Sequence, residues 1–191
     1  EDASRSDISF LKSVYQNGIE CGADRICLCD TVGILTPDSS FELFSNFKDF
    51  KVPVSAHCHN DFGLAVANTL SAIKGGATTF HSTINGIGER AGNTSFEECV
   101  VSIDRLFSQF TTNIKINEIY DISKLVARST GVYIQPNKAI VGENAFAHES
   151  GIHVHGILNN ASTYEPMSPE MVGHSRRIIL GKHTGANAVR A

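Results

Sequence analysis

The chain has 191 residues, of which 41% are hydrophobic and 19% are charged, and its formal net charge is −4. This length allows one folded domain with a small appendage, and the composition excludes a disordered chain. The acidic balance and the lack of a basic cluster give no electrostatic case for a nucleic-acid partner. No apolar run approaches the ~20 residues of a membrane helix, so we expect no membrane partner either.

The cysteines and the first residue bear on the setting of the protein. The five cysteines include no Cys-x-x-Cys pair, and their odd number argues against a disulfide scaffold. Reduced thiols indicate a cytoplasmic protein. Cys27 and Cys29 should share one face of a strand as small buried hydrophobic residues. The chain opens on Glu1 rather than Met, and we expect it to be a piece of a longer protein.

Hydrophobic periodicity predicts helices and strands in alternation over the first ~110 residues. The expected helices are 8–18, 38–50, 62–74 and 95–110, and the expected strands are 24–29, 52–56 and 78–84. Strands that alternate with helices favour a parallel sheet, and three such units cannot close an eight-stranded barrel. The residues alone therefore leave two alternatives, a part of a barrel and an open sheet.

The rhythm changes after residue 112. Helices are expected at 117–131 and 142–158, and a short strand at 177–180, with Pro- and Gly-containing turns around the strand. We therefore divide the chain into a strand–helix domain, 1–112, and a mainly helical subdomain, 113–191.

Two histidines stand at the end of the second predicted strand, where residues 57–61 read His-Cys-His-Asn-Asp. Residues i and i+2 of a strand point to the same face, so His57 and His59 can reach one ion. Neutral imidazole suits Zn, Mn and Fe. The alternative is a pair of hydrogen-bonding histidines. Asp61 would join them only if the strand continued past Asn60.

A Gly-rich loop follows the next strand, and residues 85–93 read Asn-Gly-Ile-Gly-Glu-Arg-Ala-Gly-Asn. Neighbouring parallel strands end at the same edge, so this loop could supply a more distant oxygen ligand. It is not a dinucleotide fingerprint, because its third glycine is misplaced. Glu89 and Arg90 could instead pair with each other.

A second histidine cluster covers residues 147–155, which read Ala-His-Glu-Ser-Gly-Ile-His-Val-His. On a helix, Glu149 would neighbour His153 at i+4 and could orient it as a general base. The alternative is a solvated helix face. Residues 182–185, Lys-His-Thr-Gly, could contact a phosphate or carboxylate, although a plain surface turn is the simpler interpretation.

Taken together, these motifs resemble the 2-isopropylmalate, homocitrate and citramalate synthase family of metal-dependent Claisen-type enzymes. The resemblance rests on residues 57–68 and 85–93 and, in the second half, on 148–153, 163–165, 169–173 and 180–185. It implies an α/β fold in which the last strand–helix units of a TM-type (β/α)8 barrel, a TIM barrel, precede a small linker subdomain.

The resemblance implies roles for individual residues, to which the spacing argument adds Glu149. The expected site comprises the metal ligands His57, His59 and Asn93, the substrate-binding residue Thr31, and the catalytic residues His153, Tyr164 and Glu149. It further implies a divalent metal (Zn, Mn or Mg), and acetyl-CoA and a 2-oxo acid as substrates. A homodimer is also implied, with each linker subdomain reaching the partner's active site.

One motif of the family is missing. Its Arg-Asp-Gly sequence, which carries a metal-binding aspartate, does not occur in this chain. The polypeptide alone is therefore predicted to be inactive. For the intact enzyme we expect 2-isopropylmalate synthesis, a step of leucine biosynthesis, with homocitrate or citramalate synthesis as alternatives. The competing classes are an acyl-CoA lyase, which would carry a cysteine in the loop where residues 89–93 have none, and a non-catalytic relative.

Overall fold

The computed structural model describes residues 1–182 and 184, which form two compact units divided between Ser108 and Gln109. His183 and Gly185 of the predicted Lys-His-Thr-Gly turn lie outside the described residues. In the part of the chain that the structure describes, no helix has the length and apolar character that a membrane crossing requires.

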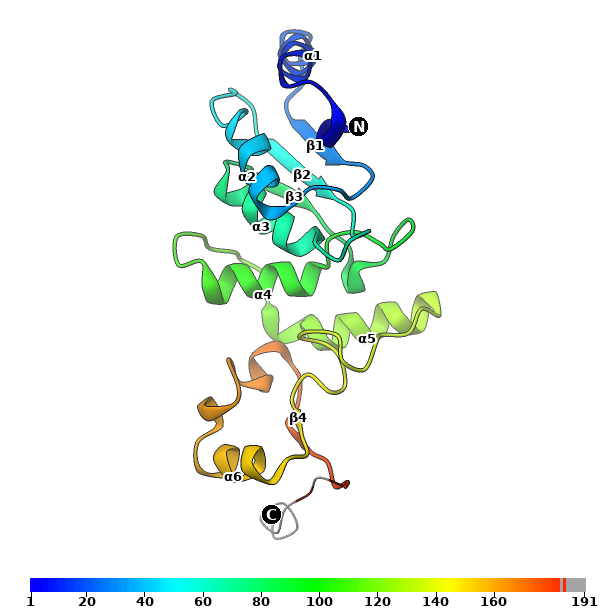
Figure 1. The fold of residues 1–191 in the computed structure, drawn as a ribbon, viewed down its shortest axis with the longest axis vertical. Helices are drawn as coiled ribbons and strands as arrows, with labels where there is room; N and C mark the ends of the chain where they lie inside the picture. Colours follow the sequence, from blue (N-terminus) through cyan, green and yellow to red (C-terminus); the bar gives the residue numbers. More distant parts are fainter. Residues whose placement is uncertain (183, 185–191) are drawn as a thin grey trace. The chain divides into compact units, whose positions relative to one another are not determined.

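The amino-terminal unit contains a three-stranded parallel sheet and its helices (Figure 1). The strands β1 (Ile26–Asp30), β2 (Val54–Cys58) and β3 (Thr79–His81) lie in that order across the sheet. The α-helices are α1 (Ile8–Glu20), α2 (Pro37–Ser45), α3 (Ala65–Lys74) and α4 (Phe96–Leu106), and the short 3-10 helices are η1 (Ala3–Arg5) and η2 (Ile84–Gly86). This order confirms the predicted parallel strand–helix units.

The two faces of the sheet differ in character. Ile26 and Leu28 of β1 are buried in one hydrophobic core with Phe44 and Phe47, which belong to α2 and the turn after it. The opposite face carries the residues of the alternate register, namely Cys27, Cys29, Ser55, His57, Thr79 and His81. Burial of the first face holds the sheet against its helices, while the second face keeps polar side chains side by side.

Several elements are shorter than predicted. The helix expected to reach Phe50 ends at Ser45, because residues 46–50 continue as tight turns closed by hydrogen bonds three residues apart. The strand expected at 78–84 covers only Thr79–His81. Asn85 adopts a left-handed φ of 64°, which ends the extended course of the backbone there.

The carboxy-terminal unit is built from short elements. It contains α5 (Ile119–Thr130), α6 (Gly151–Asn159), the 3-10 helices η3 (Ile116–Glu118), η4 (Ala161–Thr163) and η5 (Pro169–Val172), and the strands β4 (Ala147–His148) and β5 (Arg177–Ile178). The two strands pair in parallel. Helix α5 ends at Gly131, whose φ of 72° is a left-handed cap that glycine adopts without strain.

The predicted helix 142–158 is wrong in its first half. Helix α6 begins only at Gly151, and Ala147 and His148 form β4 instead. The backbone of β4 hydrogen-bonds to β5, with the Ile179 N–H donating to the His148 carbonyl at 2.9 Å. This pairing across about 30 residues overrides the local helical pattern. Glu149 consequently lies outside the helix, and the i, i+4 relation to His153 does not exist.

Candidate functional site

The two predicted metal-binding histidines meet at the carboxyl end of β2. His57 and His59 bring their Nε2 atoms to 3.2 Å from each other. Two imidazole nitrogens that each lie about 2.1 Å from one ion are separated by roughly 3.0–3.4 Å. The spacing therefore fits two ligands of a single ion.

Two buried polar atoms at this site lack a hydrogen-bond partner within the described residues: Nδ1 of His59, the second ring nitrogen of that imidazole, and Oδ1 of Asn93. His59 and Asn93 face each other in a β-bridge, which holds the Gly-rich loop against the strand end. An unsatisfied buried acceptor costs about 1–3 kcal/mol, so a cation near Oδ1 would relieve a real penalty. The donor set of two imidazoles and an amide oxygen fits a divalent metal ion.

His81 extends the histidine pair to the neighbouring strand. It lies opposite His57 in the register of β2 and β3, and the two Nδ1 atoms are 3.3 Å apart. Burial, followed by the proximity of His59 and His81, lowers the pKa of His57 and favours the neutral imidazole that binds metals. The sequence argument missed His81, which the parallel register could have placed beside His57.

The described residues do not complete a metal site with an acidic ligand. No group of three or more His, Cys, Asp or Glu side chains in residues 1–182 and 184 is arranged to hold a metal ion. Asp61, the acidic residue of the His-Cys-His-Asn-Asp stretch, lies beyond the strand, which ends at Cys58. Arg90 donates to both Asp61 carboxylate oxygens, at 2.7 and 2.9 Å. This guanidinium holds the pKa of the Asp61 carboxyl below its usual range.

The same arginine reaches Thr31, the predicted substrate-binding residue. Arg90 donates to the Thr31 carbonyl at 2.8 Å, so it pairs with Asp61 and Thr31 rather than with Glu89. The Thr31 hydroxyl oxygen accepts a hydrogen bond of 2.6 Å from the backbone N–H of Asp2. Thr31 directly follows β1, so it lies at the same sheet edge as the histidine pair.

The glycines of the loop make room for the Asn93 side chain. A Cβ at Gly88 would lie 2.4 Å from Asn93 Nδ2, and a Cβ at Gly92 would lie 2.0 Å from the Gly86 carbonyl oxygen. Gly92 also has a left-handed φ of 99°. Only residues without a Cβ allow the loop to fold back so closely.

The second predicted pair, His153 and Tyr164, comes together in the carboxy-terminal unit. Their rings stack with centroids 4.1 Å apart and an interplanar angle of 27°. Gly156 accommodates the tyrosine, because a Cβ there would lie 2.6 Å from a Tyr164 ring carbon. Glu149 points elsewhere, and its Oε1 would meet a Cβ at Gly181 at 2.5 Å. The structure thus brings together two of the three predicted catalytic residues.

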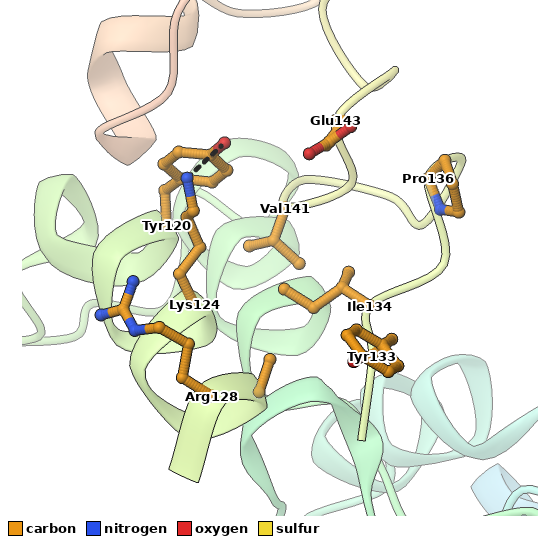
Figure 2. Close-up of a pocket in the computed structure, with 9 residues that line it drawn as sticks. Tyr120, Lys124, Arg128, Tyr133, Ile134, Pro136, Val141 and Glu143 are labelled. Carbon is orange, nitrogen blue, oxygen red and sulfur yellow. Dashed lines mark hydrogen bonds between the residues drawn. The ribbon is translucent and has the colours of Figure 1, made fainter. Parts of the chain in front are cut away.

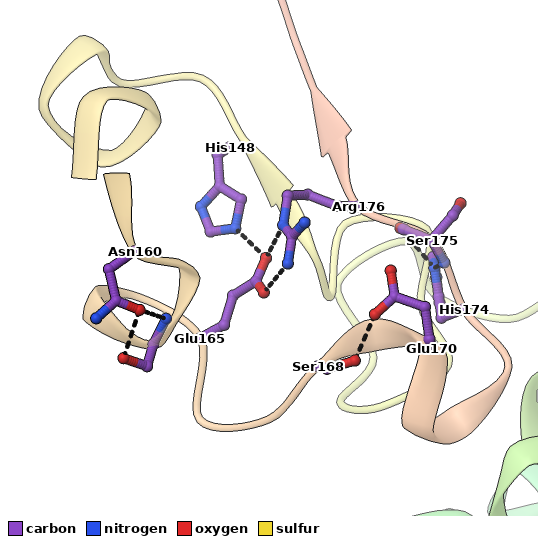
Figure 3. A network of polar contacts seen from close by, with 9 residues as sticks. His148, Asn160, Glu165, Ser168, Glu170, His174, Ser175 and Arg176 are labelled. Carbon is purple, nitrogen blue, oxygen red and sulfur yellow. Dashed lines mark hydrogen bonds and ion pairs between the residues drawn. The ribbon is translucent and has the colours of Figure 1, made fainter. Parts of the chain in front are cut away.

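A buried ionic network beside this pair was not foreseen (Figure 3). Arg176 donates to both carboxylate oxygens of Glu165, at 2.7 and 2.6 Å, and His148 Nε2 lies 3.3 Å from Glu165 Oε1. The side chain of Glu165 is only 3% exposed. No signal in the sequence marks these contacts, since they join residues 11 and 17 positions apart.

A pocket of about 220 Å³ lies in the same unit, on α5 and the segment that follows it (Figure 2). Its walls are mostly apolar, and the Lys124 ammonium lies 4.9 Å from the centroid of the Tyr120 ring. None of its lining residues belongs to the predicted site, so the pocket offers no support for those assignments.

Comparison with known families identifies the fold. Residues 1–126 match the HMGL-like family, and residues 140–191 match the homocitrate synthase post-HMGL domain-like family. The chain belongs to the HMGL-like family. This membership confirms the resemblance drawn from the motifs, and the HMGL-like family depends on a divalent metal.

Two curated relatives come from Methanocaldococcus jannaschii. The (R)-citramalate synthase CimA is 56% identical over 191 residues, covering 100% of this HMGL-like chain and 39% of the relative. The 2-isopropylmalate synthase is 55% identical over 192 residues, covering 100% and 37%. The chain therefore spans less than half the length of these relatives.

A solved structure supports the fold of the barrel part. The hydroxymethylglutaryl-CoA lyase from Pseudomonas aeruginosa superposes with a TM-score of 0.60 at 20% identity, over 67% of this chain and 45% of the lyase. At 20% identity the match shows a common fold and says nothing about activity. The predicted partial α/β barrel followed by a small subdomain is confirmed.

Proposed function

We propose that the full-length protein condenses acetyl-CoA with a 2-oxo acid in a metal-assisted Claisen reaction, and that the acceptor is pyruvate. The observation that carries the reaction class is the His57–His59 pair, with its ligand-like spacing and the unsatisfied Asn93 oxygen, in a metal-dependent family. The relatives favour citramalate synthesis, one of the two alternatives, over the 2-isopropylmalate synthesis expected first.

The chain's own residues divide the work between the two units. His57, His59 and Asn93 would hold the ion, which supplies Lewis-acid polarisation of the acceptor ketone. Zn, Mn and Mg all remain candidates for that ion. The Thr31 hydroxyl would bind the carboxylate of the 2-oxo acid at the same sheet edge.

Proton transfer is assigned to the stacked pair of the carboxy-terminal unit. His153, assisted by Tyr164, would take a proton from the acetyl methyl group. The resulting carbanion would form a carbon–carbon bond to the ketone carbon as the C=O π bond breaks, and the alkoxide oxygen would take up a proton to become a hydroxyl. Hydrolysis of the thioester then releases CoA and a second carboxylate. In a homodimer, as the family resemblance implies, this pair would serve the partner's site. We propose no role for Glu149, because it lies outside helix α6 and has no i, i+4 relation to His153.

The lyase alternative finds no support in the site. Residues 89–93 contain no cysteine, and Cys99 is fully buried within α4. It cannot take the place of an exposed loop thiol. A non-catalytic relative would not need the unsatisfied Asn93 oxygen beside the histidine pair.

The acceptor assay tests the proposal directly. The full-length protein, loaded in turn with Zn, Mn or Mg, would be given acetyl-CoA with pyruvate, 2-oxoisovalerate or 2-oxoglutarate, and CoA release would be measured. We expect the highest kcat/KM with pyruvate. Preference for another acceptor would overturn the substrate assignment, and no CoA release with any combination would overturn the reaction class.

A variant of His153 tests the proton-transfer role. His153→Ala should lower kcat by about 100-fold or more, the usual contribution of a general base, without loss of bound metal. His155→Ala is the matched control, since His155 is exposed on the same helix and contacts only Asn159 among the interactions described. Normal turnover of His153→Ala would remove His153 from the mechanism.

A further inference from the structure

The network around Glu165 is linked to both members of the His153–Tyr164 pair. Glu165 directly follows Tyr164 in the chain, and its carboxylate holds His148 and Arg176 (Figure 3). The ring of His148 in turn lies edge-on to His153, with centroids 6.3 Å apart. Of the two aromatic neighbours of His153, His148 therefore contacts the Glu165 carboxylate, and Tyr164 precedes Glu165 in the chain.

The Glu165 carboxylate determines which ring nitrogen of His148 donates a hydrogen bond to it. The Arg176 guanidinium holds the pKa of the Glu165 carboxyl below its usual range, so the group is ionised near neutral pH. An ionised carboxylate only accepts hydrogen bonds, so the Nε2 atom of His148 must carry the proton that it donates. Glu165 therefore selects one orientation and one protonated nitrogen of the imidazole.

The backbone around Tyr164 is held by local hydrogen bonds, and the network connects this turn to β5. The N–H groups of Tyr164 and Glu165 both donate to the Ala161 carbonyl, at 3.2 and 3.1 Å. Arg176 precedes β5, which pairs with β4, the strand that ends at His148. The Glu165–Arg176 ion pair therefore connects the turn after Tyr164 to β5, and through β5 to β4. We infer that this connection positions the Tyr164 side chain, which stacks on His153.

Stability alone is a weak reason for such a pair. Bringing two charges out of water costs several kcal/mol each, and well-packed apolar residues often stabilise a fold as well. Here the nearly dry carboxylate sits one residue from a proposed catalytic side chain. We propose that Glu165 and Arg176 are positioning residues that act through His148 and Tyr164 on His153, an inference that rests on the proposed function.

The test uses the full-length metal-loaded protein with acetyl-CoA and its best acceptor. Glu165→Gln keeps the size of the side chain but removes its charge, and we expect kcat to fall on the order of ten- to a hundredfold. Both KM values should stay within about twofold and the bound metal should not change, because no network residue is among the proposed metal ligands or the proposed substrate-binding residue Thr31. Arg176→Lys keeps the charge and should recover more activity than Arg176→Met.

Two controls separate positioning from folding. Glu170→Gln removes a nearby carboxylate that pairs with Ser168, and it should leave kcat unchanged. Val172→Ala removes buried volume from the same unit, and it should lower the melting temperature while kcat of the folded protein stays. If Val172→Ala and Glu165→Gln lose kcat alike at equal loss of melting temperature, the role of Glu165 is only structural.

The two proposals fail in different ways. If His153→Ala and Tyr164→Phe lose turnover while Glu165→Gln keeps wild-type kcat, the positioning role is refuted and the proposed function stands. If His153→Ala and Tyr164→Phe both turn over normally, the proposed catalytic pair itself is refuted, and the positioning role falls with it.

Discussion

At the scale of single residues, the candidate metal centre depends on a glycine as much as on its ligands. Gly88 leaves the space that the Asn93 amide occupies, and its φ is not left-handed, so space rather than strain is at issue. Gly88→Ala should displace the amide and lower the metal affinity of the full-length protein about tenfold or more. Calorimetric titration of the metal-free protein with Zn or Mn measures the change in metal affinity.

The matched control for this substitution is Gly18→Ala. Gly18 lies in α1, where an added Cβ would meet no atom within 4 Å, and its φ is also ordinary. Alanine should raise the free energy of unfolding by roughly 0.5 kcal/mol there, without touching metal affinity. Equal metal affinity in the two variants would show that Asn93 is not a ligand.

At the scale of elements, the Glu165–Arg176 pair joins the turn after η4 to the start of β5. The pKa of Glu165 is lowered in the folded state, mainly by the hydrogen bond from Arg176. The ionised form therefore favours folding. Its contribution is complete above the ordinary pKa of 4.5 and is lost as the pH falls through the lower folded value.

This linkage predicts the acid stability of the carboxy-terminal unit. Arg176→Met should cost about 2–3 kcal/mol at neutral pH, because it leaves a buried carboxylate without its partner. The difference from wild type should stay constant from about pH 7 to about pH 5 and shrink below the ordinary pKa of 4.5, as the carboxylate takes up a proton. Urea unfolding monitored by circular dichroism, from about pH 7 to about pH 3, measures the difference in the free energy of unfolding. A difference that does not change with pH would contradict the assigned ion pair.

At the scale of the whole molecule, the described chain supplies only part of an active site. Its parallel sheet has three strands, and the described residues offer two histidines and an amide but no acidic metal ligand in one group. We therefore predict that the 191-residue polypeptide, purified alone, releases no CoA from acetyl-CoA and pyruvate under conditions where the full-length protein does. Metal-dependent turnover by the polypeptide itself would refute this.

The sequence by itself determined the elements whose signals are local. Apolar periodicity predicted α1, β1, β2, α3, α4 and α5 within a few residues, because burial on one face requires that spacing. The His-x-His pair followed from strand geometry, and its Nε2 atoms do meet. The motifs further indicated a family that the comparisons confirm.

The tertiary structure decided what depends on distant partners. Residues 147–148 form a strand only because β5 lies beside them, so no local pattern could have excluded the predicted helix. For that reason Glu149 does not stand one helical turn before His153. Glu165 instead contacts both His148 and Arg176. Likewise, β2 ends at Cys58, so Asp61 does not follow His57 and His59 along the strand. Its carboxylate pairs with Arg90. The partners of long polar side chains are the groups that the fold brings close in space. The spacing of residues along the chain does not reveal which distant groups these are.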